Sequence, residues 1–131
     1  MLIVEDQDFM RQSLRDYLQS AYPEAAILEA ADGAQALALC HSRAPRLVLM
    51  DVQLPDANGI DLTAQIKQIL PDTAIIMVSQ HAGSAYVDRA RAAGACAYIT
   101  KDKVYRQLLP TVGSALERKA PPLDSGVCAP K

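Results

Sequence analysis

The sequence predicts an α/β domain in which helices cover both faces of a parallel β-sheet. Short apolar runs alternate five times with longer segments of helical periodicity along the 131 residues. Three of these runs, Leu2–Val4, Leu47–Met50 and Ala74–Val78, are almost wholly apolar, which indicates strands buried on both faces. A chain of this length buries enough surface to fold as one domain.

The first two strand–helix units are expected before residue 45. Leu2–Val4 precedes a helix whose apolar face is formed by residues at helical spacing: Met10, Leu14, Tyr17 and Leu18. The second strand is expected at Ala25–Leu28. The helix after it is expected to begin at Asp32-Gly33 and to bury one face, formed by Ala34, Leu37, Ala38 and, as a further candidate, Cys40.

The third and fourth units follow the same pattern. Leu47–Met50 precedes a helix with apolar positions at Ile60, Leu62, Ile66, Ile69 and Leu70. Pro71 ends this helix, because proline has no amide hydrogen and clashes with the preceding turn. Ala74–Val78 precedes an alanine-rich helix around Tyr86, Val87 and Ala90, which Gly94 is expected to end.

The last unit pairs a strand at Cys96–Ile99 with a final helix. The apolar positions of this helix are Val104, Leu108, Val112 and Leu116. Pro110 and Gly113 interrupt the pattern and predict a kink or a local break. Residues after about 119 are rich in Pro, Ser and Gly, so we expect a domain over 1–118 and an unfolded tail over 119–131. Right-handed crossovers favour the flavodoxin-like strand order 2-1-3-4-5.

Composition and charge exclude several classes of protein. A net charge of -2 provides no excess of Lys and Arg for a nucleic-acid surface. Cys40, Cys96 and Cys128 are widely separated without a CxxC pair, so neither a disulfide framework nor a thiolate metal site is predicted. The apolar runs are too short to span a bilayer, and the first residues are acidic where a signal peptide is basic. These features predict a soluble protein of the reducing cytosol.

Polar side chains follow four of the predicted strands. They are Glu5 and Asp6 after the first, Asp51 after the third, Ser79 after the fourth, and Thr100 with Lys101 after the fifth. These strands are neighbours in the expected order, so their carboxyl ends should bring the side chains together. Taken singly, an Asp suits a helix N-cap, a Lys a surface charge and a Ser a turn. The complete set favours a functional site.

The acidic residues of this set predict a divalent-cation site. Three carboxylates this close raise one another's pKa unless a cation compensates their charge. We expect Asp6 and Asp51 to bind Mg²⁺ directly with the backbone carbonyl of Gln53, and Glu5 to act through water. Lys101 would balance the charge of an arriving phosphoryl group, and Ser79 would donate to one of its oxygens. Asp51 is then the predicted nucleophile, which forms an acyl phosphate.

Several motifs occur in a specific order along the chain. They are Val4-Glu5-Asp6, Asp51-Val-Gln-Leu-Pro55 with Asn58-Gly59, Ser79, and Tyr98-Ile-Thr-Lys101. Together they resemble the receiver domains of bacterial two-component response regulators, over roughly residues 1–118. The resemblance implies that Asp51 is the phospho-acceptor, that Glu5 and Asp6 are the acidic pair, and that Mg²⁺ is bound.

The resemblance also assigns the groups that respond to phosphorylation. Ser79 and Lys101 would sense the phosphoryl group, and Tyr98 would be the aromatic residue that reorients; a half-buried strand aromatic is the alternative for Tyr98. Ser79-Gln-His81 and Ala92-Ala-Gly-Ala95 look most like receivers that precede LuxR-type DNA-binding domains.

Three features depart from the family pattern. Gln80 follows Ser79 where many receivers have a small residue, which predicts more crowded access for the phosphoryl group. Gln53 and His81 stand where the family influences hydrolysis of the acyl phosphate, and we hypothesise that they shield it and prolong its lifetime. A solvent-facing loop imidazole is the alternative for His81. Pro110 alters any partner surface inferred for the last helix.

A phosphorylation-dependent signalling switch is therefore the predicted function, with a histidine kinase or phosphotransfer protein as donor. The main rival is a phosphatase of the haloacid dehalogenase type, which needs a second carboxylate at the position of Gln53. A module that binds partners without phosphorylation is the third alternative.

Output from such a switch needs a partner or a further domain. About a dozen residues follow the last expected helix, too few for a helix-turn-helix domain. We expect output through a downstream effector, or through a DNA-binding domain if the chain is part of a longer regulator. No direct contact with nucleic acid or membrane is expected, and phosphorylation-dependent homodimerisation is a further hypothesis.

Overall fold

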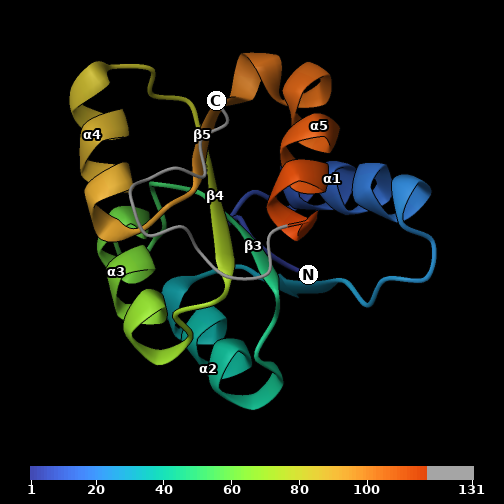
Figure 1. The fold of residues 1–131 in the computed structure, drawn as a ribbon, viewed down its shortest axis with the longest axis horizontal. Helices are drawn as coiled ribbons and strands as arrows, with labels where there is room; N and C mark the ends of the chain where they lie inside the picture. Colours follow the sequence, from blue (N-terminus) through green and yellow to red (C-terminus); the bar gives the residue numbers. More distant parts are fainter. Residues whose placement is uncertain (118–131) are drawn as a thin grey trace.

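Five parallel strands form the centre of the structure, a computed structural model that describes residues 1–117 (Figure 1). The strands are β1 Leu2–Val4, β2 Leu28–Ala30, β3 Leu47–Met50, β4 Ala74–Ser79 and β5 Ala97–Thr100. Their order in the sheet is β2-β1-β3-β4-β5, which confirms the predicted flavodoxin-like arrangement. The expected domain boundary at 118 and the tail over 119–131 lie outside the described residues.

Helices cover both faces of this sheet. They are α1 Asp8–Ala21, α2 Gly33–Arg43, α3 Gly59–Ile69, α4 Ser84–Ala93, the 3₁₀ turn η1 Lys101–Lys103, and α5 Val104–Glu117. Successive strand residues face opposite sides, so Leu2 and Val4 pack toward Ile66 of α3, whereas Ile3 packs toward Leu14 of α1 and Leu108 of α5. Helices α2, α3 and α4 therefore cover one face, and α1 and α5 cover the other (Figure 1).

The helix ends follow local sequence signals. Asp32 caps α2 by accepting a hydrogen bond of 2.8 Å from the amide of Gln35. Asn58 caps α3 in the same way, accepting from the amide of Ile60 at 2.8 Å. Gly94 ends α4 with a φ of 112°, a left-handed conformation that side chains disfavour.

Three strands differ from the predicted boundaries, and the smallest difference is in β4, which ends at Ser79, one residue later than expected. Strand β2 begins at Leu28, not at Ala25, because the carbonyl of Ala25 belongs to a turn in which it accepts a hydrogen bond from Gln19 at 3.2 Å. Glu29 lies within β2, where it pairs with Ile3 of β1, and its carboxylate pairs with arginines of α1. Hydropathy does not indicate these tertiary contacts. Strand β5 begins at Ala97, one residue later than expected.

The predicted buried face of α2 was partly wrong. Ala34 and Ala38 are exposed, whereas Ala36 and Cys40 are buried. Alanines occur on both faces of this helix, so apolar spacing alone does not identify the inner one. Ile69, at the end of α3, is also partly exposed.

The last helix has no break at Pro110 or Gly113, while the alternative of a kink stays a prediction. Helix α5 runs from Val104 to Glu117 through Pro110 and Gly113. Pro110 lies on the exposed side, where the carbonyl left without an amide partner can bind water. The buried Val104 and Val112 anchor the helix on both sides of the proline.

The structure places two of the three cysteines and gives the lengths of the helices. Cys40 is buried and Cys96 is partly buried, while Cys128 lies outside the described residues. Within residues 1–117, no helix is both long and apolar enough to cross a lipid bilayer.

Candidate functional site

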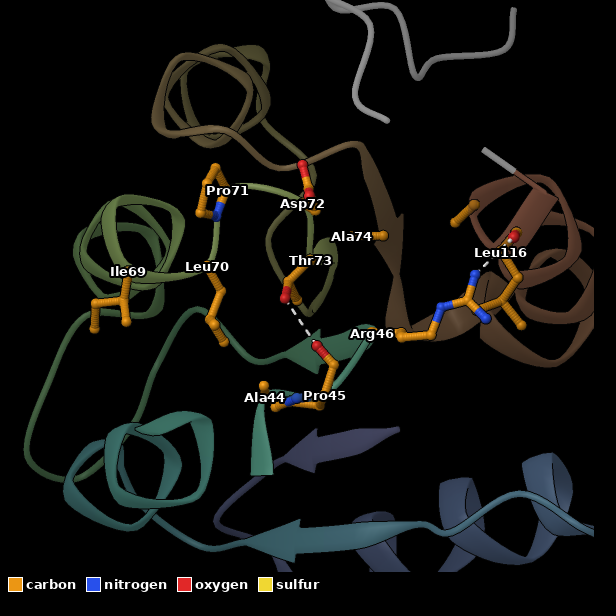
Figure 2. A pocket seen from close by; sticks show the side chains of 11 residues that line it. Ala44, Pro45, Arg46, Ile69, Leu70, Pro71, Asp72, Thr73, Ala74 and Leu116 are labelled. Carbon is orange, nitrogen blue, oxygen red and sulfur yellow. Dashed lines mark hydrogen bonds between the residues drawn. The ribbon is translucent and has the colours of Figure 1, made fainter. Parts of the chain in front are cut away.

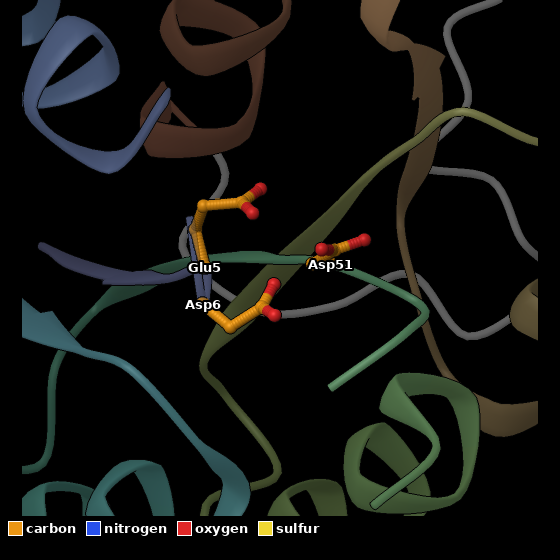
Figure 3. Close-up of side chains that lie close together, drawn as sticks. All are labelled: Glu5, Asp6 and Asp51. Carbon is orange, nitrogen blue, oxygen red and sulfur yellow. The ribbon is translucent and has the colours of Figure 1, made fainter. Parts of the chain in front are cut away.

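Backbone pairing continues one residue beyond the carboxyl ends of β1 and β3. The amide of Glu5 donates to the carbonyl of Ala30 at 3.0 Å, and the amide of Asp51 donates to the carbonyl of Val4 at 3.1 Å. These bonds fix the points at which Glu5 and Asp51 leave the sheet. Figure 3 shows their side chains at this edge together with that of Asp6.

Glu5, Asp6 and Asp51 form an acidic cluster at this edge. One carboxylate oxygen from each lies within 4.8 Å of the others. Glu5 and Asp51 are buried, with 1% and 6% of their surface exposed, whereas Asp6 is exposed. Carboxylate oxygens at this spacing are the donors that hard divalent cations prefer. The cluster therefore fits a cation such as Mg²⁺.

Lys101 lies against this cluster from the end of β5. Its Nζ is 2.9 Å from Oε1 of Glu5 and 3.4 Å from Oδ2 of Asp51. Burial alone would lower the pKa of Lys101, but the hydrogen bond to Glu5 and the charge of Asp51 outweigh it and raise the pKa. Lys101 is therefore a stable positive charge beside two carboxylates.

The two buried carboxyl groups are only partly compensated by this lysine. Burial raises the pKa of Asp51, and the opposing charge of Lys101 offsets that effect only in part. Burial also raises the pKa of Glu5, against the hydrogen bond from Lys101. A bound divalent cation would supply the missing positive charge.

The loop after β3 holds Asp51 through a close backbone contact. The amide of Gly59 donates to the carbonyl of Val52 at 2.6 Å. A Cβ at position 59 would lie 1.9 Å from the backbone oxygen of Asp51, so only glycine fits there. Gln53 forms an antiparallel bridge with Asn58, and its amide donates to Oδ1 of Asp51 at 3.3 Å.

Ser79 and Tyr98 are connected through the backbone of His81. The amide of His81 donates to Oγ of Ser79 at 3.0 Å, and the hydroxyl of Tyr98 donates to the carbonyl of His81 at 2.8 Å. Ser79 is buried at the end of β4 and Tyr98 is half-buried in β5. Because Oγ accepts here, the Ser79 hydroxyl proton is free to be donated.

The ring of His81 packs against α4. It stacks on Tyr86 with ring centroids 4.5 Å apart and an interplanar angle of 10°. Gln80, which precedes His81 in the loop, is exposed. His81 is therefore half-buried against an aromatic ring, and not the solvent-facing imidazole of the alternative interpretation.

The structure brings Glu5, Asp6, Asp51 and Lys101 together as expected. One residue beside the cluster was not singled out from the sequence. Arg11 of α1 donates to the carbonyl of Glu5 at 2.8 Å. This role of Arg11 depends on tertiary contacts, which no sequence pattern indicated.

Comparison with known proteins identifies the family. The family model described as response regulator receiver domain matches residues 1–112. The chain belongs to the response regulator receiver domain family. Domains of this family act in phosphorylation-dependent signalling, and the resemblance predicted from the motifs is confirmed.

Individual relatives support this placement. The receiver domain is 37% identical to the transcriptional regulatory protein PdtaR of Mycobacterium tuberculosis over 120 residues, 90% of this chain and 57% of that protein. It also spans about half of the response regulator protein VraR of Staphylococcus aureus, with 34% identity over 77% of this chain and 48% of that protein.

A solved structure matches the receiver domain over most of its length. The two-component response regulator of the LuxR family from Aurantimonas sp. SI85-9A1 aligns with a TM-score of 0.79 and 29% identity, covering 94% of this chain and 89% of that one. The likeness agrees with the predicted similarity to LuxR-type regulators.

A separate pocket lies at the amino-terminal ends of the strands, whereas the acidic cluster lies at their carboxyl ends (Figure 2). It has a volume of about 290 Å³ and lies between the starts of β3 and β4 and the end of α5. Thr73 donates to the carbonyl of Pro45 at 2.8 Å, and Arg46 donates to the carbonyl of Leu116 at 3.3 Å. None of the residues lining it belongs to the acidic cluster.

Proposed function

We propose that this receiver domain accepts a phosphoryl group on Asp51 from a histidine kinase or a phosphotransfer protein. The observation that supports it best is the environment of Asp51: a buried carboxylate beside two other carboxylates and 3.4 Å from a lysine ammonium. Burial and neighbouring charge are the features by which proteins tune reactive groups.

Mg²⁺ is the proposed cofactor, held by Asp6, Asp51 and the backbone carbonyl of Gln53. Both carboxylate oxygens of Glu5 already accept hydrogen bonds, from Lys101 at 2.9 Å and from the amide of Gln7 at 3.1 Å. Glu5 therefore fits an indirect role through water. When bound, the cation would offset the negative charge that gathers around the transferring phosphoryl group.

The transfer itself requires positioning of one carboxylate oxygen. An oxygen of Asp51 attacks the phosphorus of a phosphohistidine on the donor, and a P–O bond forms as the P–N bond breaks. The electron pair of that bond remains on the donor imidazole, which takes up a proton. Lys101 balances the charge of the acyl phosphate, and the strand end holds Asp51 in place.

The phosphorylated state differs from the unphosphorylated state by its new oxygen acceptors. Ser79 donates its free hydroxyl proton to one of them, and the loop that contains His81 follows. Tyr98 moves with that loop, because its hydroxyl is bound to the His81 carbonyl. This is a population shift between two conformations of the surface around α4 and β5.

The proposed role is that of a switch and not of a turnover phosphatase. Gln53 stands two residues after Asp51, where a haloacid-dehalogenase-type enzyme would need a general acid, and an amide has no titratable proton. At most, the domain would catalyse its own phosphorylation and dephosphorylation.

The output of the switch would come from a further domain of the same protein or from a separate partner protein. The receiver domain matches about half the length of relatives such as a transcriptional regulatory protein, so an attached DNA-binding output domain is one proposal and a separate effector the other. We further propose a cytoplasmic location and homodimerisation on phosphorylation. In each case the signal is the surface change that follows phosphorylation.

Mass spectrometry after incubation with MgCl₂ and acetyl phosphate tests the proposal. We expect wild type to gain one phosphoryl group and Asp51→Asn to gain none. Asp56→Asn, which changes another carboxylate of the same loop outside the cluster, should be phosphorylated like wild type. An unmodified wild type, or equal modification of Asp51→Asn, would refute the assignment, and turnover of p-nitrophenyl phosphate at enzyme rates would favour a phosphatase.

A further inference from the structure

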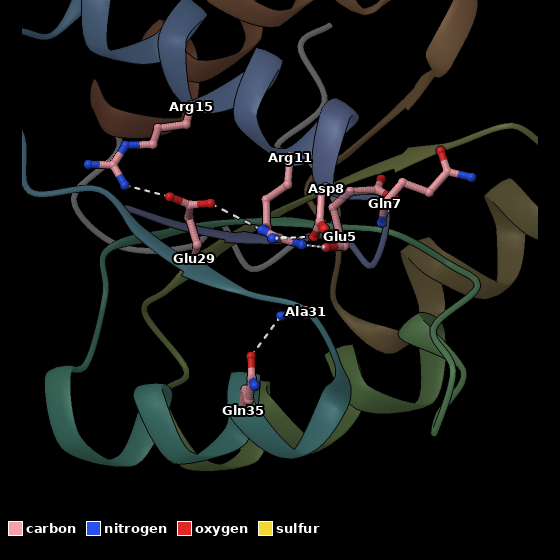
Figure 4. A network of polar contacts seen from close by, with 8 residues as sticks. All are labelled: Glu5, Gln7, Asp8, Arg11, Arg15, Glu29, Ala31 and Gln35. Carbon is pink, nitrogen blue, oxygen red and sulfur yellow. Dashed lines mark hydrogen bonds and ion pairs between the residues drawn. The ribbon is translucent and has the colours of Figure 1, made fainter.

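Arg11 connects three separate segments beside Glu5 of the acidic cluster (Figure 4). Its Nη1 donates to the backbone carbonyl of Glu5 at 2.8 Å, and its Nη2 lies 2.6 Å from Oδ1 of Asp8. Its Nε donates to Oε1 of Glu29 at 3.1 Å. The side chain is only 16% exposed, so the guanidinium is held in one orientation between the end of β1, the start of α1 and β2.

Arg15 contacts the same Glu29 from the next turn of α1. It binds the second carboxylate oxygen of Glu29, so Glu29 lies between two guanidinium groups. The hydrogen bonds from Arg15 and then Arg11 lower the pKa of Glu29. Glu29 therefore remains ionised. The guanidinium of Arg11 is anchored to β2 through its Nε, while its Nη1 binds the carbonyl of Glu5.

The Glu5 carbonyl matters because it belongs to the peptide that leads into Asp6. A peptide unit is planar, so fixing its carbonyl oxygen fixes the direction in which the Asp6 backbone leaves the strand. The Glu5 amide is bound to Ala30 at 3.0 Å, and the amide of Gln7 donates to Oε2 of Glu5 at 3.1 Å. Asp6 itself is exposed, so its side chain has little packing to orient it.

Charge and positioning make opposite predictions for Arg11. A guanidinium near three carboxylates repels a divalent cation, so removing it should tighten Mg²⁺ binding if charge alone matters. If the guanidinium orients the peptide before Asp6, removing it should weaken Mg²⁺ binding.

We propose that Arg11 is a positioning residue of the cation site, which orients Asp6 by holding the Glu5 carbonyl. The inference depends on the proposed function, because it assumes that the cluster binds Mg²⁺. This role requires no contact between Arg11 and the phosphoryl group or the cation. It acts through the backbone of the acidic pair.

Isothermal titration with MgCl₂ on the full chain tests the proposal. We expect Arg11→Ala to weaken Mg²⁺ binding about 10-fold or more, the effect typical of losing a group that orients a metal ligand. Arg15→Ala is the matched control: it removes the same charge and a bond to the same Glu29, but no bond to Glu5. Its Mg²⁺ affinity should equal or slightly exceed that of wild type.

The Mg²⁺ dependence of phosphorylation by acetyl phosphate gives a second readout. Arg11→Ala should need a higher Mg²⁺ concentration for half-maximal phosphorylation, while its rate at saturating Mg²⁺ stays close to that of wild type. A reduced rate at saturating Mg²⁺ with unchanged Mg²⁺ affinity would indicate a general structural defect and would overturn the proposal.

Two further results decide the matter. Arg11→Ala that binds Mg²⁺ as tightly as wild type, or more tightly, overturns the proposal, because charge removal alone predicts that result. If Arg11→Ala does not fold, Arg11→Lys replaces it: one ammonium keeps the charge but cannot hold Glu5, Asp8 and Glu29 together. Weakened Mg²⁺ binding by Arg11→Lys then supports the proposal, and Mg²⁺ binding equal to that of wild type overturns it.

Failure of the proposed function is distinguishable from failure of this proposal, because wild type itself would then bind no Mg²⁺.

Discussion

The hydroxyl of Tyr98 donates a hydrogen bond of 2.8 Å to the backbone carbonyl of His81. The amide of the same His81 donates to Ser79, so one residue links the serine proposed to sense the phosphoryl group with the aromatic residue proposed to reorient. A displacement of Ser79 toward a phosphoryl oxygen therefore acts on the same loop that holds Tyr98. This connection does not depend on contact between the two side chains.

Tyr98→Phe should separate phosphorylation from the conformational response. The ring remains, but the hydrogen bond to His81 is lost, at a cost of about 1 kcal/mol in free energy of unfolding. We expect Asp51 to be phosphorylated at nearly the wild-type rate, while beryllofluoride produces smaller amide chemical-shift changes in α4. Tyr105→Phe, which alters an exposed tyrosine that packs on Tyr17, is the control. Wild-type shift changes in Tyr98→Phe would contradict the coupling.

Gln53 and His81 are expected to slow hydrolysis of the acyl phosphate. The side chain of Gln53 is exposed, and its backbone nitrogen lies 3.3 Å from Oδ1 of Asp51. The ring of His81 is held by its stack on Tyr86. Replacing both with alanine should open the site to water and speed dephosphorylation several-fold, as followed by mass spectrometry after donor removal.

The matched control for that double variant removes the same residue types elsewhere. Gln107 on α5 and His41 on α2 are both exposed. The double alanine variant at these positions should dephosphorylate at the wild-type rate. Equal lifetimes for the two double variants would reject the shielding hypothesis.

Gly59→Ala should damage both stability and the site. The added Cβ would lie 1.9 Å from the backbone oxygen of Asp51, so either β3 or the start of α3 must move. We expect a loss of about 1–3 kcal/mol in the free energy of unfolding, or more, and slower phosphorylation. Urea unfolding and the acetyl phosphate assay measure the two effects.

Gly113→Ala is the opposite case within the same chain. Its added Cβ would meet the hydroxyl of Tyr22 at 3.9 Å, an ordinary contact, in the interior of α5. Alanine is the better helix former by roughly 1 kcal/mol, so this variant should be more stable than wild type. If both glycine variants had the same stability, the close approach at Gly59 would not be the cause.

The sequence was sufficient to predict most of the sheet and the acidic cluster, because both depend on local patterns. Apolar runs identify strands buried on two faces, and residues at the ends of neighbouring parallel strands must meet. The end of β2 was misplaced because the charged Glu29 lies inside the strand, where it pairs with two arginines that are distant in sequence. Arg11 was missed for the same reason.

The last helix shows a different limit of sequence interpretation. Proline predicts a break from local geometry alone, but Pro110 lies on the exposed side of a helix anchored by Val104, Leu108 and Val112. The packing of both halves on one face outweighs the lost hydrogen bond. Helix propensity depends on local geometry, whereas the burial of apolar side chains on both sides of Pro110 determines whether the helix is continuous.

Asp56 should make the stability of the receiver domain depend on pH. Its carboxylate accepts hydrogen bonds from the amides of Gly33 at 2.7 Å and Ala34 at 3.1 Å, which lower the pKa of Asp56 below its ordinary value. A carboxyl group with a lowered pKa in the folded state stabilises the fold above its unfolded pKa, and this contribution disappears as the pH falls through the folded value. Asp56→Asn should therefore have a lower Tm than wild type at pH 7, and the difference should shrink as the pH falls below about 4. Asp72→Asn, at an exposed turn, is the control, and a Tm difference for Asp56→Asn that does not change with pH would contradict the assignment.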